Sequence, residues 1–424
     1  MKQLIPILIL LATPVWTEPS YITVDEAVRI ALEMHPEFKA AGLNVSAAKS
    51  DLSAAITQQF PTASLNSSMT HYSDPQSLSL SGQSIQVGPE DEFTLSGRID
   101  QPIYSGGRIT TQIDRAKIQN DIAKLELKSK RNQIIADIRN ICYEVLRYEA
   151  LVKAANEAID AAKAHRNDAE ARVRAGVSAG IEVIRADARI KEAELDAVSK
   201  KNALETARAR LAINLNMPTI ERIEIRGELP EAGIQRPFDD PEAEALRRRP
   251  DLVSLRASAR AEELGIKLER SSYMPQVNAF TSWSYRDDDI SNKNDEGWKL
   301  GLNASWEIFN WGRMSAKVRS AQYRAGSARE RSALLERTVK QEVREATLAI
   351  LSAKESLELT EARMNSSRED LRISRLRFNE GVGIGTEVID AEVALSNAEA
   401  QHINARVDLA ESYNRFWLVT GGDY

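Results

Sequence analysis

The stretch WKLGLNASWEI, residues 298–308, alternates apolar side chains with polar or small ones from its first residue to its last. A period of two residues is typical of a β-strand whose two faces meet different surroundings. An apolar face with a Trp near each end, opposed by a polar face, is the pattern of a strand in a transmembrane β-barrel. A tilted strand needs about ten residues to cross a bilayer. Residues 298–308 therefore predict one membrane-spanning strand.

Three other stretches repeat this alternation. One strand is expected from Phe93 to Ile103, and candidate partner strands run from Ala63 to Met69 and from Val277 to Tyr285. We therefore expect four transmembrane strands per chain, arranged as two β-hairpins. An aromatic belt at the membrane surface is expected to contain Phe93, Trp283, Trp298 and Trp306. The pattern leaves one alternative open, a soluble hairpin whose apolar face packs on helices.

The number of strands predicts an oligomer. Four strands cannot close a barrel, and an open sheet edge is not tolerated in lipid. Three chains would supply twelve strands, whereas two would supply eight, which are too few to leave an aqueous lumen. We therefore expect a homotrimer that completes one 12-strand barrel in outer-membrane lipid.

The rest of the chain predicts long helices. All 14 prolines lie at or before Pro102 or between Pro218 and Pro275, and the two Pro-free tracts are rich in helix-forming residues. Apolar or small residues recur at steps of four and three from Ile134 to Val173, and again 205 residues later. This 3.5-residue period is typical of coiled coils. Residues 109–175 contain neither Gly nor Pro, and one helix over them would be about 100 Å long. A helix of that length must run along a fibre or the wall of a tube.

Spaced motifs indicate a tandem duplication. Phe60-Pro61 resembles Met274-Pro275 at an offset of 214 residues, and Gly176-Val177 matches Gly381-Val382 at an offset of 205. The difference falls in the Ser/Gly/Gln-rich stretch 73–90, where we expect a longer loop. The expected fold is mainly α with a small β part, in which long α-helical hairpins form a coiled-coil α-barrel. The expected boundaries are repeat 1 at 18–215 (helix, β-hairpin about 61–105, long helix about 109–175, helix about 180–215), a linker or equatorial region at 216–240, and repeat 2 at 241–424 (helix, β-hairpin about 275–310, long helix about 313–380, helix about 385–418).

The N-terminus has the layout of an export signal. A basic start is followed by an apolar run at residues 4–12, which is too short to span a bilayer. We expect a signal peptide at residues 1–17. A buried N-terminal helix is the alternative.

Composition excludes several classes of protein. A net charge of −6 argues against a nucleic-acid partner, and the single Cys142 excludes an internal disulfide and a Cys-based zinc cluster. The four His residues have no metal-ligand spacing, and we expect each at the surface or at a helix cap. The glycine-rich stretch 381–385 lacks the strand and the Lys of a phosphate-binding loop. We therefore expect no enzyme activity, no cofactor and no metal, and a structural role for the Cys142 thiol.

Two copies of a strand pair followed by a very long helical hairpin resemble the TolC-like outer-membrane channel family. The resemblance covers essentially the whole mature chain, and the motifs that carry it are duplicated at fixed offsets. These motifs are Phe60-Pro61, Met274-Pro275, residues 103–108 (IYSGGR), residues 377–382 (RFNEGV) and residues 387–391 (EVIDA). The resemblance implies a passive exit duct of a Gram-negative cell, from the outer membrane into the periplasm. It also implies a periplasmic adaptor (membrane fusion) protein and an inner-membrane pump or ABC transporter as partners, in efflux or type I secretion.

The hairpin turns are the expected functional end of the chain. Gly176, Val177, Gly381 and Val382 are expected to form tight turns, and the resemblance implies that they face the adaptor. Glu387 and Asp390 lie three residues apart on one helix face. The resemblance places them at the entrance, where a trimer would have two rings of carboxylates that favour cations.

Repeat 1 differs from repeat 2 at this end. Glu182 occupies the position of Glu387, and Arg185 that of Asp390. The resemblance assigns Glu182 to holding the entrance shut, and our hypothesis is that Arg185 pairs with a carboxylate there. Solvated helix-end charges, worth at most about 1 kcal/mol each, are the alternative for all four residues.

A second function class stays open at this point. A periplasmic coiled-coil structural or adaptor protein, with no membrane barrel, would share the heptads and the export signal. The need for detergent during extraction distinguishes the duct from the scaffold. The transported substrate cannot be inferred from the residues.

Overall fold

The computed structural model describes residues 20–80, 83–217, 223–227, 239–288 and 295–422. The chain divides into two compact units, and each contains segments of both halves of the sequence. The helical unit comprises Met1–Ala40, Lys128–Arg249 and Arg337–Tyr424, and the sheet unit comprises Ala41–Leu127 and Pro250–Glu336. The expected signal peptide at 1–17 lies outside the described residues.

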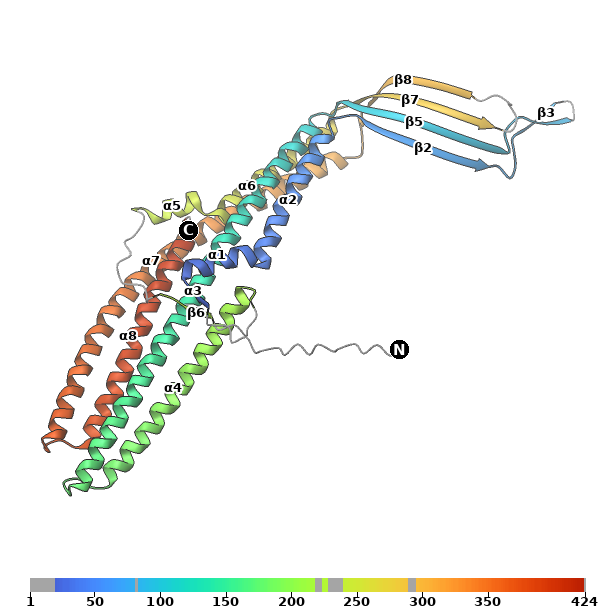
Figure 1. Cartoon of the computed structure of the whole chain (residues 1–424). Helices are drawn as coiled ribbons and strands as arrows, with labels where there is room; N and C mark the ends of the chain where they lie inside the picture. Colours follow the sequence, from blue (N-terminus) through green and yellow to red (C-terminus); the bar gives the residue numbers. More distant parts are fainter. Residues whose placement is uncertain (1–19, 81–82, 218–222, 228–238, 289–294, 423–424) are drawn as a thin grey trace, which may run out of the picture. The chain divides into compact units, whose positions relative to one another are not determined.

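The sheet unit contains the four expected strands. They are β2 (Thr62–His71), β5 (Asp91–Tyr104), β7 (Gln276–Asp288) and β8 (Asp295–Ser305). All neighbours are antiparallel, in the order β2-β5-β7-β8 (Figure 1). The loop expected at 73–90 contains a further hairpin of β3 (Ser77–Leu80) and β4 (Gln83–Gln86). The expectation of a longer loop was therefore incomplete, since each strand has only four residues and the alternation in 77–80 (SLSL) is too short to stand out.

The strand register assigns side chains to two faces as the alternation predicts. Leu65 lies opposite Gly97, Gly97 opposite Trp283, and Trp283 opposite Trp298. Leu300 and Leu302 lie on the same face, and both are more than 70% exposed. Residues at alternate positions form a polar face, where Arg98 pairs with Asp100 at 2.7 Å. The apolar face of the sheet is thus uncovered in the single chain.

Four helices of the sheet unit connect to the strands, and glycine turns lead into two of them, α3 (Arg108–Arg174) and α7 (Arg313–Asn379). The four are most of α2 (Pro36–Thr57), α6 (Pro250–Arg270) with the 3₁₀ turn η1 (Ser271–Tyr273), and the N-terminal parts of α3 and α7. Before α3, Gly106 has φ +60° and a Cβ there would lie 2.6 Å from the Cβ of Met274. Only glycine combines this backbone conformation with so close an approach.

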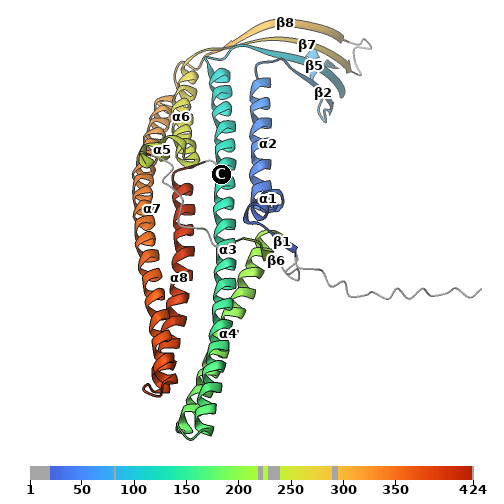
Figure 2. The ribbon, with the colours of Figure 1, turned by 60° about the vertical axis from the view of Figure 1, so that its left-hand side comes forward.

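The helical unit contains two long antiparallel hairpins. The C-terminal parts of α3 and α7 pair with α4 (Ile181–Asn214) and α8 (Gly385–Val419), respectively (Figure 2). The heptad positions Ile138, Val145, Val339 and Val343 are at most 1% exposed, which confirms the predicted seam. The unit also contains the short helices α1 (Val24–Met34) and α5 (Pro241–Arg248).

Two strands lie where the sequence indicated no sheet. β1 (Ser20–Ile22) pairs in parallel with β6 (Ile223–Ile225), which falls inside the expected linker. Three-residue strands are too short for a period to be recognised. In the described part of the chain, no helix combines the length and the apolarity needed to cross a membrane.

Candidate functional site: the two hairpin turns

Both hairpin turns have the same backbone geometry, offset by 205 residues. Gly176 and Gly381 each have φ +77°. The N–H of Val177 donates to the carbonyl of Arg172, and that of Val382 to Arg377, both at 3.1 Å. Each glycine N–H donates to the carbonyl three residues earlier. This pair of bonds is the Schellman motif, which satisfies the last carbonyls of a helix and requires the left-handed conformation at the glycine. Val177 and Val382 are consequently presented to solvent, 70% and 72% exposed.

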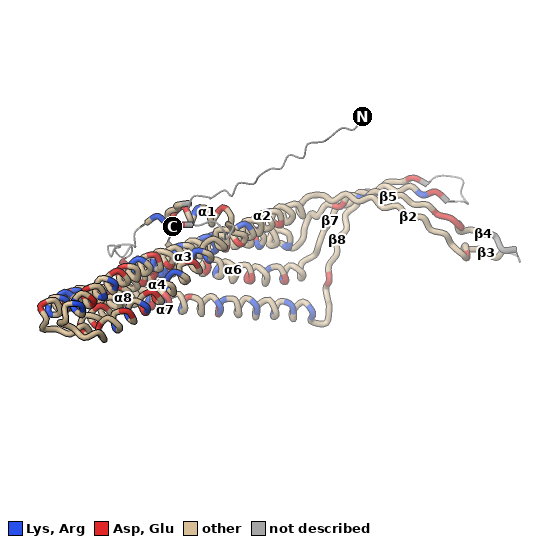
Figure 3. Tube along the Cα trace, turned by 60° about the horizontal axis from the view of Figure 1, so that its bottom comes forward, with Lys and Arg blue, Asp and Glu red and all other residues tan. Residues whose placement is uncertain are grey.

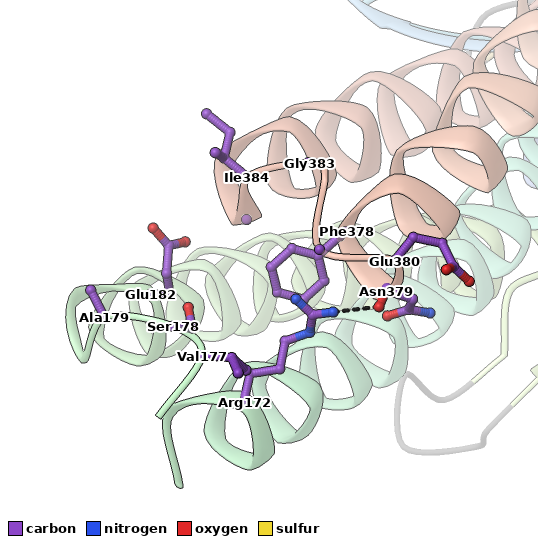
Figure 4. Close-up of a pocket in the computed structure, with 12 residues that line it drawn as sticks. Arg172, Val177, Ser178, Ala179, Glu182, Phe378, Asn379, Glu380, Gly383 and Ile384 are labelled. Carbon is purple, nitrogen blue, oxygen red and sulfur yellow. Dashed lines mark hydrogen bonds between the residues drawn. The ribbon is translucent and has the colours of Figure 1, made fainter. Parts of the chain in front are cut away.

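Arg172 of the first hairpin reaches the second hairpin. Its guanidinium lies 4.4 Å from the centre of the Phe378 ring and donates to the backbone carbonyl of Asn379 at 2.5 Å (Figure 4). Asn379 is the last residue of α7. A cation at a helix C-terminus satisfies a free carbonyl and interacts favourably with the helix dipole. Arg172 therefore ties the two turns together.

Glu182 makes the complementary contact. Glu182 lies in the first turn of α4. One of its carboxylate oxygens is buried against Gly385, the first residue of α8. A negative group is favoured at a helix N-terminus. The other oxygen accepts from Arg185 at 3.2 Å. A side chain at position 385 would occupy the space of the Glu182 carboxylate, so the glycine permits this contact.

These residues surround a pocket of about 600 Å³ between the two turns. Its lining comes from the segment between Arg172 and Glu182 and the segment between Phe378 and Gly385. Figure 4 shows the guanidinium of Arg172, from the first hairpin, beside the ring of Phe378, from the second. In the described part of the chain, no cluster of His, Cys, Asp and Glu is placed to hold a metal ion.

The acidic pair predicted in repeat 2 lies outside this pocket. Glu387 is exposed and lies 3.7 Å from the guanidinium of Arg377. Asp390 is exposed one turn further along α8. Glu182 and Arg185, which occupy the equivalent positions in repeat 1, pair with each other. The hypothesis that Arg185 pairs with a carboxylate thus finds its partner on the same helix.

The expectation of a surface or cap position fails for His165. His165 is 5% exposed, and its ring centre lies 5.3 Å from that of Phe378. Burial lowers the pKa of His165, and the nearby carboxylates of Glu392, Asp168 and Glu182 oppose that effect. Its Nε2 has no hydrogen-bond partner among the described residues. His165 adjoins the heptad seam, and the apolar pattern gave no reason to place an imidazole inside.

Two other residues that the sequence singled out have structural positions. His35 caps the C-terminus of α1, as expected of a His residue there. Cys142 is fully buried, and burial raises the pKa of its thiol to about 12. A thiol that stays protonated is unreactive, in agreement with the predicted structural role.

Comparison with known proteins identifies the family. The model of the family described as "Outer membrane efflux protein" matches residues 27–216 and 243–422, which together are most of the chain. The chain belongs to the outer membrane efflux protein family. Members of this family are channels rather than enzymes, and membership places the chain in the outer membrane, from which it extends into the periplasm.

The individual relatives that the chain matches are distant. Outer membrane protein TolC of Vibrio cholerae is 24% identical over 178 residues, which are 41% of this chain and 40% of the relative. Outer membrane protein OprJ of Pseudomonas aeruginosa is 28% identical over 189 residues, 41% of this chain and 39% of the relative. The alignments thus span about two fifths of the length of these relatives.

The fold has close counterparts among solved structures. The outer-membrane channel OprN superimposes with a TM-score of 0.83 at 22% identity, covering 94% of this chain and 90% of that one. This likeness confirms the expected fold class of long helical hairpins with a small sheet.

Proposed function

We propose that three copies of this chain form a passive exit duct across the outer membrane and periplasm, as the outer component of a tripartite efflux pump. The observation that carries the proposal is the open four-stranded sheet with an uncovered apolar face. Lipid provides apolar surroundings for that face, and the polar face with Arg98 and Asp100 suits an aqueous lumen.

The sheet edges support the trimer. β2 and β8 lie at the edges of the sheet, and each pairs with one neighbour in the described chain. Backbone groups left unpaired in hydrocarbon cost several kcal/mol each, so the edges must meet other strands. Three copies joined β8 to β2 would close a barrel of twelve strands, which matches the expected size.

The aromatic side chains support a membrane position for the sheet. Trp298 is 74% exposed, and Trp306 follows the other end of β8 at 58% exposed. Trp283 lies opposite Trp298 on the neighbouring strand, and Phe93 lies two residues after the start of β5. Aromatic rings at both ends of an apolar band mark the two membrane interfaces of a barrel.

Relatives favour efflux over protein secretion. The fusaric acid resistance protein FusA of Burkholderia cepacia is 27% identical over 189 residues. The cobalt-zinc-cadmium resistance protein CzcC of Cupriavidus metallidurans is 25% identical over 230 residues. A resistance protein of this family implies an inner-membrane pump that supplies the substrate and a periplasmic adaptor that joins pump to duct. Type I secretion, served by an ABC transporter, is the less favoured use of the same duct.

The hairpin turns are the proposed contact with the adaptor. Gly176 and Gly381 hold Val177 and Val382 outward, so that a trimer would present six exposed valine turns. An apolar residue fixed on a rigid turn is suited to a groove between partner helices.

Glu387 and Asp390 are the proposed aperture carboxylates, and Glu182 with Arg185 holds the first turn against the second. Single-channel conductance of the detergent-purified protein in a planar bilayer tests the duct and the aperture together. We expect discrete cation-selective openings from the wild type. The variant Glu387→Gln with Asp390→Gln should lose much of the cation preference without losing conductance, because each trimer loses six carboxylates from the entrance.

The matched control is Glu355→Gln with Glu358→Gln. These residues also lie three apart on an exposed face, on α7 rather than beside a turn. Unchanged selectivity in the first variant would refute the aperture. Absence of conductance from a wild-type protein that needs no detergent for extraction would refute the duct and favour a periplasmic scaffold.

A further inference from the structure

The N-terminal part of α7 is far more basic than its counterpart in repeat 1. Residues 313–332 contain six Lys or Arg and one Glu, whereas residues 108–127 contain four basic and three acidic residues. Figure 3 shows Lys and Arg as blue segments along α7, beyond the end of β8. The equivalents of Lys317, Arg319 and Arg324 in repeat 1 are Gln112, Asp114 and Gln119. The repeats therefore share a fold here but differ in what their surfaces attract.

The basic side chains are not used for packing within the chain. Lys317, Arg319 and Arg324 are exposed, and none of the three has an ion-pair partner in the described part of the chain. In repeat 1, by contrast, Asp114 pairs with Lys117 at 3.1 Å. Cations without counterions along one short stretch of helix repel one another, so an external anion would stabilise them.

A hollow of about 480 Å³ lies beside Arg319 and Arg324. It is lined by Ala316, Arg319, Ser320, Tyr323, Arg324 and Ser327. Two guanidinium groups beside hydroxyl groups match the oxygens of a phosphodiester, because arginine donates two parallel hydrogen bonds to such an anion. Tyr323 is 77% exposed and adds an aromatic surface next to both arginines.

A strained tryptophan lies immediately before this helix. Trp311 is 91% exposed and has φ +52°, in the left-handed region that bulky residues rarely adopt. Repeat 1 has Gly106 at this position. The rings of Trp311 and Phe309 meet edge to face, with centroids 5.0 Å apart. Backbone strain of this kind clusters at functional sites, and exposed aromatic residues beside membrane strands are typical of the interface with lipid headgroups.

Helix geometry brings the cations to that interface. Lys317 and Arg319 lie about 6 and 9 Å along the axis from the first residue of α7, and Arg324 about 17 Å. Side chains on a helix point back toward its N-terminus, and long basic side chains extend to reach headgroups. All three charges therefore lie within reach of the membrane surface or within about a Debye length of it.

We propose that Arg319, Tyr323 and Arg324 form a binding site for the phosphodiester headgroup of an anionic phospholipid in the periplasm-facing leaflet, and that Lys317, on the same helix face as Arg324, adds positive charge beside it. The inference rests on the proposed function, because the barrel sets the membrane boundary at Trp306 and Trp311. Repeat 1 lacks the site, so a trimer would carry three such sites.

Native mass spectrometry of the detergent-purified full chain tests the site, with dioleoyl phosphatidylglycerol and dioleoyl phosphatidylcholine as probes. We expect the wild type to retain phosphatidylglycerol preferentially. Each basic residue near an anionic membrane surface contributes about a fivefold preference. The variant Lys317→Gln, Arg319→Gln, Arg324→Gln should therefore lose the preference by at least about tenfold. Gln112 and Gln119 show that glutamine fits two of these positions in repeat 1.

The matched control is Arg337→Gln, Lys340→Gln, Arg344→Gln. It removes three exposed charges from the same helix, beginning about 36 Å along the axis from Arg313. The control should retain the preference. Equal retention of phosphatidylglycerol by the first variant and the wild type would overturn the site.

Three further results separate the possible causes of failure. A first variant that no longer forms trimers, with or without lipid, would show that this face contacts another copy, and would also overturn the lipid site. Conductance in neutral bilayers without any lipid preference would refute the lipid site and leave the duct intact. Absence of conductance from the wild type would refute both.

Discussion

The two hairpin turns share one backbone and use it differently. Gly176 and Gly381 have the same φ and cap their helices with the same hydrogen bonds. Yet Arg172 extends to the other hairpin, whereas its equivalent Arg377 pairs with Glu387 in its own. One carboxylate oxygen of Glu182 is buried against Gly385, whereas Glu387 is exposed. The duplication thus preserved the turn and changed the contacts, so that repeat 1 supplies the charges and repeat 2 supplies the helix ends that receive them.

The largest expected difference between the turns concerns their apolar residues. Phe378 is 4% exposed and contacts both Arg172 and His165, whereas its equivalent Val173 is only partly buried. Phe378→Ala should destabilise the chain by about 3 kcal/mol, and Val173→Ala by about 1 kcal/mol. Denaturant unfolding of the detergent-purified protein measures both. Equal losses would mean that Phe378 does not organise the contact between the turns.

A smaller effect is expected from the two equivalent arginines. Arg172→Gln removes a charged hydrogen bond and a cation–π contact between the hairpins, at a cost of about 1–2 kcal/mol. Arg377→Gln breaks an exposed pair and should cost less than about 1 kcal/mol. Because Arg172, unlike Arg377, links the two hairpins, only the Arg172 variant of this pair should raise the open probability in single-channel recordings. Equal gating in both variants would contradict the asymmetry.

The smallest expected effect depends on pH. Burial lowers the pKa of His165 below its ordinary value near 6.5, so the unfolded tip takes up a proton first as the pH falls. The contribution of His165 to the stability of the tip is therefore fully present above about pH 6.5. It is lost as the pH falls toward the lower pKa of His165 in the folded tip. Arg375 adds to this effect, and the carboxylates of Glu392, Asp168 and Glu182 reduce it.

Hydrogen exchange of the hairpin amides measures this loss. Between pH 7 and pH 5.5, opening of the first hairpin should increase by up to about tenfold after correction for intrinsic exchange. His165→Gln should remove the dependence. The equivalent residue of repeat 2 is Asp370, which is exposed. Apart from the amides near Phe378, hydrogen exchange in the second hairpin should therefore depend less on pH. If the His165→Gln variant keeps the same pH dependence of hairpin opening, titratable groups other than His165 cause it.

Much of the fold could be predicted because its signals are local. The heptad positions from Ile134 and from Val339 predicted the seams, and alternation from Trp298 predicted β8 and the face it presents. Glycine after a long helix predicted the turns, since a left-handed residue is required there. The resemblance indicated the family that the comparisons show. The assignment of Glu387 and Asp390 to an aperture stays a prediction, as does the contact of Val177 and Val382 with an adaptor.

What the chain encodes locally is its periods of two and 3.5 residues, its turns and its duplication, because each of these depends on neighbours a few positions away. Which equivalent charges become buried was decided only by tertiary packing. Arg172 and Arg377 occupy equivalent positions before the two turns, and Glu182 and Glu387 equivalent positions after them, yet their surroundings come from helices about 200 residues distant in the chain. Burial, dielectric surroundings and the nearness of a helix end are properties of that packing, so no local pattern could distinguish the pairs.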